Sequence, residues 1–219
     1  MAAPVTDPLL VGVTTCKGRL MHLRVTQWSK LRELDRLVVV DYGCPQRTAD
    51  ALRGADEQLF ALRVEDGADL WNPGRARNAG LLYVRQAWAG PVRLVFVDAD
   101  TELLEGFGAW ARAMPDGAIG VADRRGQRDV QELQGLLVVD LERLGPGYEE
   151  WPEYGYEDQA LRYRLWCEGA AIERVPLNLL RAIRHRNTTR FRYYPQPRPA
   201  RTPALVRSMP SDYPGRFVP

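Results

Sequence analysis

The chain has 219 residues, of which 45% are hydrophobic and 26% are charged, with a formal net charge of +2. It is long enough for one sizeable core, so we expect one globular domain with a tail. The nearly balanced charge gives no support to a dedicated nucleic-acid binder, although only two of the 30 basic residues are lysines.

The cysteines Cys16, Cys44 and Cys167 are odd in number, far apart, and include no CxxC pair. This argues against a disulfide framework or a zinc site and favours a reducing compartment. No apolar run approaches the roughly 20 residues of a membrane span, and no basic stretch precedes the first apolar residues. We therefore expect a soluble, cytoplasmic protein without a transmembrane segment, for which peripheral membrane contact stays open.

The first hundred residues alternate between apolar runs and helical patterns. Short apolar runs predict strands at 9–15, 37–40, 59–64 and 94–97. Between them, helices are predicted at about 20–34, from near Thr48, and from the segment 71–80 to about Trp88. In the first helix the apolar positions near helical spacing are Leu20, Leu23, Trp28 and Leu31. Strands alternating with helices indicate a mostly parallel α/β sheet.

The second half is less regular. It predicts a strand at 135–140, a turn plus helix at 155–168 and a last strand-like run at 174–180. After Tyr194 the composition changes, with seven prolines among residues 195–219 and few apolar residues. Such a tail buries little surface, and it is either an extended or partly disordered strap or a basic lid or binding arm.

An Asp-Ala-Asp triplet, residues 98–100, closes the run Leu94–Val97. In an extended chain alternate side chains point the same way, so Asp98 and Asp100 are expected on one side. Hard cations such as Mg²⁺ and Mn²⁺ take carboxylate oxygens and leave room for phosphate, whereas a solvated turn is the alternative. Open parallel sheets bind ligands at the carboxyl ends of their strands, where Thr14, Thr15 and Asp41 also fall.

Four stretches, in order, resemble the nucleotide-sugar glycosyltransferases with the GT-A fold, especially family 2 and the related galactosyltransferase-like domains. They are VVVDYGCPQ, WNPGRARNAG, LVFVDAD and GLLVVDLERLGPGYEEWPEYGYEDQALRYRLWCEGA. The resemblance implies a Rossmann-like, mostly parallel sheet flanked by helices in a single domain at 9–192. Residues 9–100 would form its nucleotide-sugar-binding half and 101–192 its acceptor half. Residues 1–8 would be an N-terminal extension and 193–219 a Pro/Arg-rich tail.

The resemblance also implies a metal-dependent transferase. Asp100 is the expected ligand of Mn²⁺ (or Mg²⁺), and Asp98 would contact the donor's ribose or share the metal. His185, in RAIRHRN, matches a late metal-ligand histidine of several relatives. Because Mn²⁺ accepts imidazole more readily than Mg²⁺ does, His185 as a ligand favours manganese. A surface histidine among arginines is the alternative.

The donor is expected to be a nucleotide sugar, with a UDP-sugar fitting best. By resemblance, Asp41 accepts from the imide N–H of the base, and the Thr14-Thr15 turn binds the base through its backbone. Arg77 lies near base or phosphate, and Asn78 either fixes the start of its helix or contacts the donor. Arg75 is equally placed by sequence, so the choice of Arg77 depends on the resemblance.

Glu157 and Asp158 follow a glycine turn and precede a helical run, and negative charge is favoured at a helix N-terminus. The resemblance assigns Asp158 as the general base of an inverting transfer, with Glu157 binding the acceptor or orienting neighbouring groups. The alternative is a helix N-terminal cap without chemistry, and capping alone could explain one of the two carboxylates.

The expected reaction is hexosyl or N-acetylhexosaminyl transfer to a hydroxyl of a carbohydrate, lipid-linked or peptide acceptor. A retaining transferase of the same fold is the nearest alternative. A sugar-phosphate nucleotidyltransferase is a further one, although no Gly-rich loop follows the first strand. A non-catalytic glycosyltransferase-like binding domain is the third.

Overall fold

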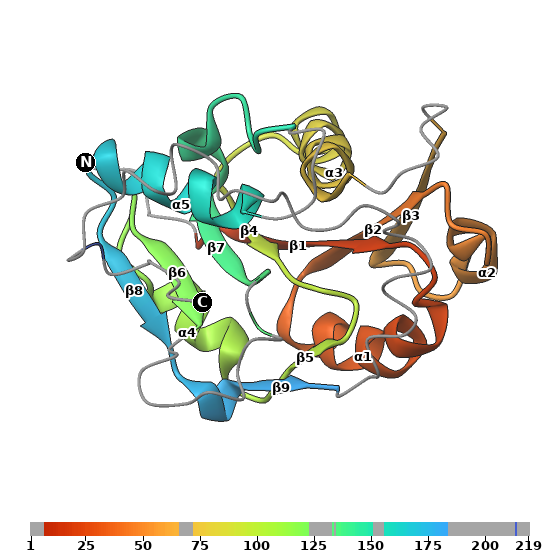
Figure 1. The fold of residues 1–219 in the computed structure, drawn as a ribbon. Helices are drawn as coiled ribbons and strands as arrows, with labels where there is room; N and C mark the ends of the chain where they lie inside the picture. The colour runs from red at the N-terminus through yellow and green to blue at the C-terminus, as the bar shows by residue number, and fades with distance from the viewer. Residues whose placement is uncertain are drawn as a thin grey trace.

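The computed structural model describes residues 7–65, 72–122, 133, 135–150, 156–183 and 213. Seven strands form one sheet in the order β3-β2-β1-β4-β7-β6-β8 (Figure 1). Their bounds in that order are Leu59–Val64, Arg36–Tyr42, Leu9–Cys16, Val92–Phe96, Leu137–Asp140, Ile119–Ala122 and Ile172–Val175. A second sheet pairs β5 (Thr101–Leu103) with β9 (Leu180–Ala182).

The strands β1 to β4 are mutually parallel, whereas β7 runs antiparallel to both of its neighbours and β6 pairs in parallel with β8. The mostly parallel sheet predicted from the sequence is therefore confirmed. Every helix in the described part of the chain is too short or too polar to cross a bilayer.

Helices cover both faces of the large sheet. Their bounds are α1 Leu20–Glu33, α2 Thr48–Leu52, α3 Pro73–Ala87, α4 Phe107–Ala113 and α5 Glu157–Cys167, with two 3-10 turns at η2 (Leu141–Leu144) and η3 (Leu177–Leu179). In Figure 1, α3 and α5 lie on one side of the sheet and α1 and α4 on the other. Two apolar cores follow from this arrangement, one on each face.

The central strands are apolar on both sides because both faces are covered. Along β2, Val38 and Val40 pack into the core under α3 and α5, while Leu37 and Val39 pack into the core over α1 and α4. Gly80 lets α3 approach closely, since a Cβ there would lie 2.5 Å from a methyl group of Val13. Helix α3 is therefore packed tightly against β1.

The predicted helices and the first four predicted strands are present, with bounds that shift by one or two residues. The run 174–180 is not one strand. β8 ends at Val175, Pro176 follows, and the chain then crosses to β9 in the second sheet. The sequence did not predict β5, β6 or α4, which are too short to show a clear hydrophobic period.

Trp28 also differs from its expected position. It sits at helical spacing with the apolar residues of α1, yet 48% of its surface is exposed. The limits of the domain at residues 9 and 192, and its division at residue 100, stay predictions.

A buried arginine connects the centre of the sheet to α4. Arg93, on β4, is 1% exposed, and its Nε donates to Oδ1 of Asp140 at 2.7 Å. Its Nη1 donates to the carbonyls of Ala111 and Met114 at 2.8 and 2.7 Å, where α4 ends. One side chain therefore donates to a carboxylate and to two backbone oxygens.

We expect Arg93→Met to lower the free energy of unfolding by about 3–5 kcal/mol, because it removes the donor to Asp140 Oδ1 and to the backbone carbonyls of Ala111 and Met114. Urea denaturation measures this change. The control is Arg53→Met, whose exposed guanidinium pairs only at the surface with Asp50, and which should cost less than about 1 kcal/mol. Equal midpoints for the two variants would contradict the role given to Arg93.

Candidate functional site

The Asp-Ala-Asp triplet forms a turn after β4. The strand ends at Phe96, and the N–H of Thr101 donates to the carbonyl of Asp98 at 3.1 Å. The expectation that an extended backbone carries both carboxylates is therefore wrong. The turn forms because the chain must change direction here to enter β5 in the second sheet.

Helix α1 holds the centre of this turn with polar side chains. Thr26 Oγ1 donates to the carbonyl of Ala99 at 2.7 Å, and Lys30 Nζ lies 2.8 Å from Thr26 Oγ1 and 3.4 Å from the same carbonyl. Lys30 is fully buried, and burial lowers its pKa to about 7, while Asp100 and Asp98 oppose that shift. Sequence reasoning missed both residues. The available signal was a threonine and a lysine four residues apart, among the apolar positions of the helix predicted at about 20–34.

Asp100 is nearly buried and is fixed from two directions. Its carboxylate forms an ion pair with Arg19, the residue that precedes α1. Its backbone carbonyl accepts from the N–H of Ile183 at 2.7 Å, just after β9. His185, the other expected ligand, lies outside the described residues, two positions beyond Ile183 in the sequence.

Arg77, on α3, joins the triplet to the start of α5. Its guanidinium lies 3.3 Å from Asp98 Oδ1, 3.3 Å from Glu157 Oε1 and 2.8 Å from Asp158 Oδ1. It also lies over the ring of Tyr148, 5.1 Å from the centroid. We call Arg77, Asp98, Glu157 and Asp158 the Arg77 cluster. Burial lowers the pKa of Arg77, but the carboxylates, Asp158 foremost, outweigh it and keep the side chain charged.

The two arginines of α3, Arg75 and Arg77, lie in different surroundings. Arg75 is exposed and contacts Glu150 at 3.1 Å, whereas Arg77 is buried in the cluster. Contact of Arg77 with the donor stays a prediction, and its present partners are carboxylates of the protein.

Glu157 and Asp158 begin α5, and both face Arg77. The residue before them, Tyr156, has a left-handed backbone with φ of 70°, which is uncommon outside glycine and is found at constrained sites. Burial raises the pKa of Glu157 to about 7, Asp158 adds to the rise, and Arg77 opposes it. Burial also raises the pKa of Asp98, with Arg77 opposing.

The raised pKa of Glu157 predicts a pH dependence of stability. Between its ordinary value of 4.5 and about 7, the folded protein binds more protons here than the unfolded chain does. Stability from this group therefore falls as pH rises through that window. We expect Glu157→Gln, which imitates the protonated acid, to reduce the loss between pH 5 and pH 8 by on the order of 2 kcal/mol.

Urea denaturation of both proteins at the two pH values measures this difference. The control is Glu142→Gln, which changes an exposed glutamate of η2 and should leave the pH dependence as it is. If Glu157→Gln loses as much stability between pH 5 and pH 8 as the wild type does, the raised pKa of Glu157 is contradicted.

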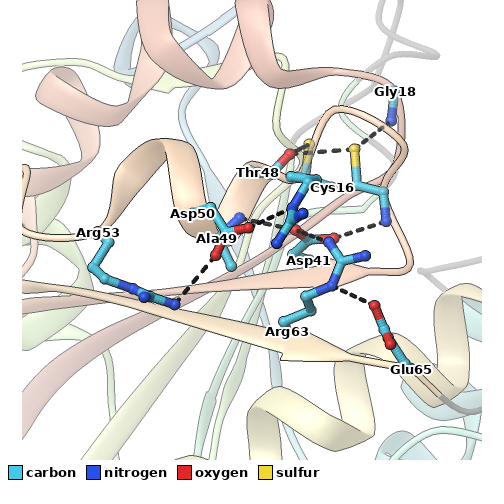
Figure 2. Close-up of polar contacts among 11 residues, drawn as sticks. Cys16, Gly18, Asp41, Thr48, Ala49, Asp50, Arg53, Arg63 and Glu65 are labelled. Atoms are coloured by element: carbon cyan, nitrogen blue, oxygen red, sulfur yellow. Dashed lines mark hydrogen bonds and ion pairs between the residues drawn. The ribbon is translucent and has the colours of Figure 1, made fainter.

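Asp41 lies at the end of β2, fully buried in a network of its own (Figure 2). Its Oδ1 accepts from the N–H of Cys44 at 2.7 Å, and its Oδ2 accepts from the N–H of Ala49 at 2.8 Å and from Arg63 at 3.2 Å. Thr48 hydrogen-bonds the sulfurs of Cys16 and Cys44 beside it. The carboxylate holds the turn between β2 and α2, and its contact with a base stays a prediction.

Thr14 and Thr15 lie within β1, opposite Val39 and Val40 of β2, and the strand continues to Cys16. They do not form the turn that the sequence suggested. Thr14 is buried and Thr15 is half-buried, so their predicted contact with the base would come from the end of the strand.

Asn78 does not fix the start of α3. That start is capped by Asn72, whose side chain accepts from the N–H of Arg75 at 2.9 Å. Asn78 instead holds Tyr148, donating to its carbonyl at 2.9 Å and accepting from its N–H at 2.8 Å. It thereby supports the ring under Arg77, and direct contact with the donor stays a prediction.

The residues around the triplet suit a divalent cation that a ligand helps to hold. Within the described ranges, no group of three or more His, Cys, Asp and Glu side chains could hold a metal ion by itself. Asp98 and Asp100 supply hard oxygen donors, and Mg²⁺ is commonly bound by one or two carboxylates together with substrate phosphates. The donor set therefore fits a cation that arrives with a diphosphate.

Comparisons with known proteins support this fold. No protein-family model and no curated protein matches the sequence. Among solved structures, the mannosyltransferase PcManGT from Pyrobaculum calidifontis, in complex with GDP-Man and Mn²⁺, matches with a TM-score of 0.61 and 17% identity, over 87% of this chain and 63% of that one. TarS 1-349 of S. aureus matches with a TM-score of 0.57 and 15% identity, over 76% and 58%.

A third match is glucosyl-3-phosphoglycerate synthase from Mycobacterium tuberculosis, in complex with Mn²⁺, UDP-glucose and phosphoglyceric acid. Its TM-score is 0.59 at 16% identity, over 82% of this chain and 73% of that one. The chain spans less than two thirds of the first two structures. These likenesses confirm the predicted GT-A fold.

Proposed function

We propose that this protein is a divalent-cation-dependent glycosyltransferase that moves a sugar from a nucleotide sugar to a hydroxyl acceptor. The Arg77 cluster carries the proposal. It brings Asp98, at the carboxyl end of β4, against Glu157 and Asp158 at the start of α5. In a GT-A sheet this is where the donor's diphosphate and the acceptor hydroxyl would meet.

The chemistry needs the leaving diphosphate to be neutralised. A bound Mn²⁺ or Mg²⁺ supplies that charge, and Asp100 and Asp98 would hold it with donor phosphate oxygens. Arg19, now paired with Asp100, adds positive charge at the same edge. His185 as a further ligand is part of the proposal, supported by Ile183, two residues earlier in the sequence, which hydrogen-bonds the backbone of Asp100.

The donor we propose is a UDP-sugar. Two of the structurally similar proteins are described with uridine nucleotides, TarS with UDP-GlcNAc and the synthase with UDP-glucose, and the third is described with GDP-Man. Thr14, Thr15 and Asp41 are the proposed base contacts, with Arg77 and Asn78 completing the donor side.

On the acceptor side, Asp158 is the proposed general base. Arg77 holds its Oδ1 at 2.8 Å, which fixes the orientation of the carboxylate, and the side chain stays partly exposed. Glu157 is the proposed acceptor-binding or orienting group. A hexose or N-acetylhexosamine is the proposed sugar, transferred with inversion.

A cytoplasmic location belongs to the same proposal. All three cysteines are free thiols, with Cys16 and Cys44 buried and Cys167 exposed. Free thiols suit a reducing compartment.

We expect Asp100→Asn to reduce cation-dependent donor turnover by roughly 100-fold or more, because loss of even a supporting group around a metal costs about 10- to 100-fold. The assay is release of UDP or GDP from a panel of nucleotide sugars, with and without Mn²⁺. Asp50→Asn, which changes a surface carboxylate paired with Arg47 and Arg53, is the control. A wild type inert toward every donor, or an Asp100→Asn variant as active as the wild type, would overturn the proposed function.

Inversion predicts a β-linked product from an α-linked donor, measured by proton NMR of the glycoside. Asp158→Asn should lower kcat by about 10²- to 10⁴-fold while the KM for the donor changes little, since a general base acts in the transition state. Glu157→Gln should be less damaging to kcat. An α-linked product would sink the inverting mechanism and leave the retaining alternative.

A further inference from the structure

Helix α1 has its polar and apolar residues on unexpected faces. Toward the protein it buries Thr26, Gln27, Ser29 and Lys30 along with leucines. The first and last of these hold the Asp-Ala-Asp turn. Toward solvent it presents Met21, Val25 and Trp28, which are 62%, 58% and 48% exposed. We call these three residues the α1 stripe.

The α1 stripe is one continuous face. Its members are spaced by four and three residues, so they lie one above another on the helix. Among the described residues, four large apolar side chains are exposed, and three of them are in the stripe. None of the three belongs to a hydrophobic cluster among the residues that the structure describes. Single exposed apolar residues are ordinary, whereas contiguous exposed apolar patches are common at interaction sites.

The exposed charge on α1 is positive. Arg24 and Arg32 are exposed, and Arg32 follows Trp28 by one turn on the same face. The other charged residues of the helix are engaged elsewhere. Lys30 is buried, and Glu33 is half-buried with its carboxylate accepting the N–H of Gly108 at 2.9 Å. The exposed side of α1 thus combines an apolar stripe with two cations and no exposed acid.

We propose that the α1 stripe binds the surface of a membrane that contains anionic lipids. Trp28, Met21 and Val25 would enter the boundary between headgroups and acyl chains, and the two arginines would extend to lipid phosphates. The positive charge of Arg24 and Arg32 complements the negative charge of these lipids. A symmetric contact with a second copy would bring Arg24 and Arg32 near the same positive charges of that copy.

Binding of vesicles by the full chain tests this proposal without donor, acceptor or cation, so its result is independent of the proposed function. The measurement is co-sedimentation with vesicles of phosphatidylcholine alone or with about one third phosphatidylglycerol. We expect the wild type to bind the anionic vesicles and to lose affinity as salt rises. The combined variant Met21→Ser, Val25→Ser, Trp28→Ser should bind roughly tenfold or more weakly, because apolar burial contributes to the affinity.

Two further variants separate the contributions. Arg24→Gln with Arg32→Gln should weaken binding to anionic vesicles by about fivefold for each arginine and leave neutral vesicles unaffected. Leu82→Ser is the matched control, since Leu82 is a similarly exposed apolar residue on α3. It should bind as the wild type does. Circular dichroism and thermal melts establish that each variant is folded.

The depth of insertion is read from one side chain. Lipids brominated on their acyl chains quench the fluorescence of inserted tryptophans. Trp28→Phe should keep most of the binding yet lose most of the quenching.

Three results would overturn the proposal. One is a wild type that does not sediment with anionic vesicles at low salt. Another is a folded stripe variant that binds as tightly as the wild type, which would assign binding to other basic segments. The third is a dimer, seen by light scattering, that dissociates in the stripe variant while vesicles are not bound. That result would show that the α1 stripe is a contact between two copies of the chain.

Discussion

One buried guanidinium, that of Arg77, faces three carboxylates from two elements far apart in the sequence. It joins Asp98 after β4 to Glu157 and Asp158 at the start of α5. Carboxylates this close would repel one another and resist ionisation without such a partner. Tyr148 lies under the guanidinium, and Asn78 holds the backbone of Tyr148 in place. The candidate site depends on this one arginine more than on either acidic motif alone.

The charge around the triplet explains why a divalent cation suits it. Four carboxylates and three basic side chains gather there, namely Asp98, Asp100, Glu157 and Asp158 with Arg19, Arg77 and Lys30. One carboxylate is in excess. Burial raises the pKa of Glu157, and the neighbouring Asp158 adds to that rise. Burial lowers the pKa of Lys30, and the carboxylates of Asp100 and Asp98 oppose that shift. A divalent cation that binds together with a diphosphate would neutralise the carboxylates of Asp98 and Asp100. The phosphate oxygens would supply the remaining ligands, so the protein need not supply all of them.

Helix α1 shows how far a hydrophobic pattern can mislead. Its apolar spacing predicted the helix correctly, and Leu20, Leu23 and Leu31 are buried as an amphipathic helix requires. Trp28 shares that spacing yet faces solvent, because Thr26 and Lys30 occupy the inner face to bind the carbonyl of Ala99. The hydrogen bonds of Thr26 and Lys30 to the turn after β4 place polar side chains on the buried face of α1. The α1 stripe lies on the opposite, exposed face.

The sequence by itself determined the alternating strands and helices, the parallel sheet and the presence of acidic residues where strands end, since these follow from local periodicity and from polar residues that close apolar runs. A family resemblance in its motifs pointed to the GT-A fold. Only the tertiary structure decided which side chains meet. Arg77 rather than Arg75 enters the acidic cluster, Asn72 rather than Asn78 caps α3, and residues 98–100 turn instead of continuing the strand. The physical reason is that these choices depend on contacts between segments distant in sequence, which local spacing does not encode.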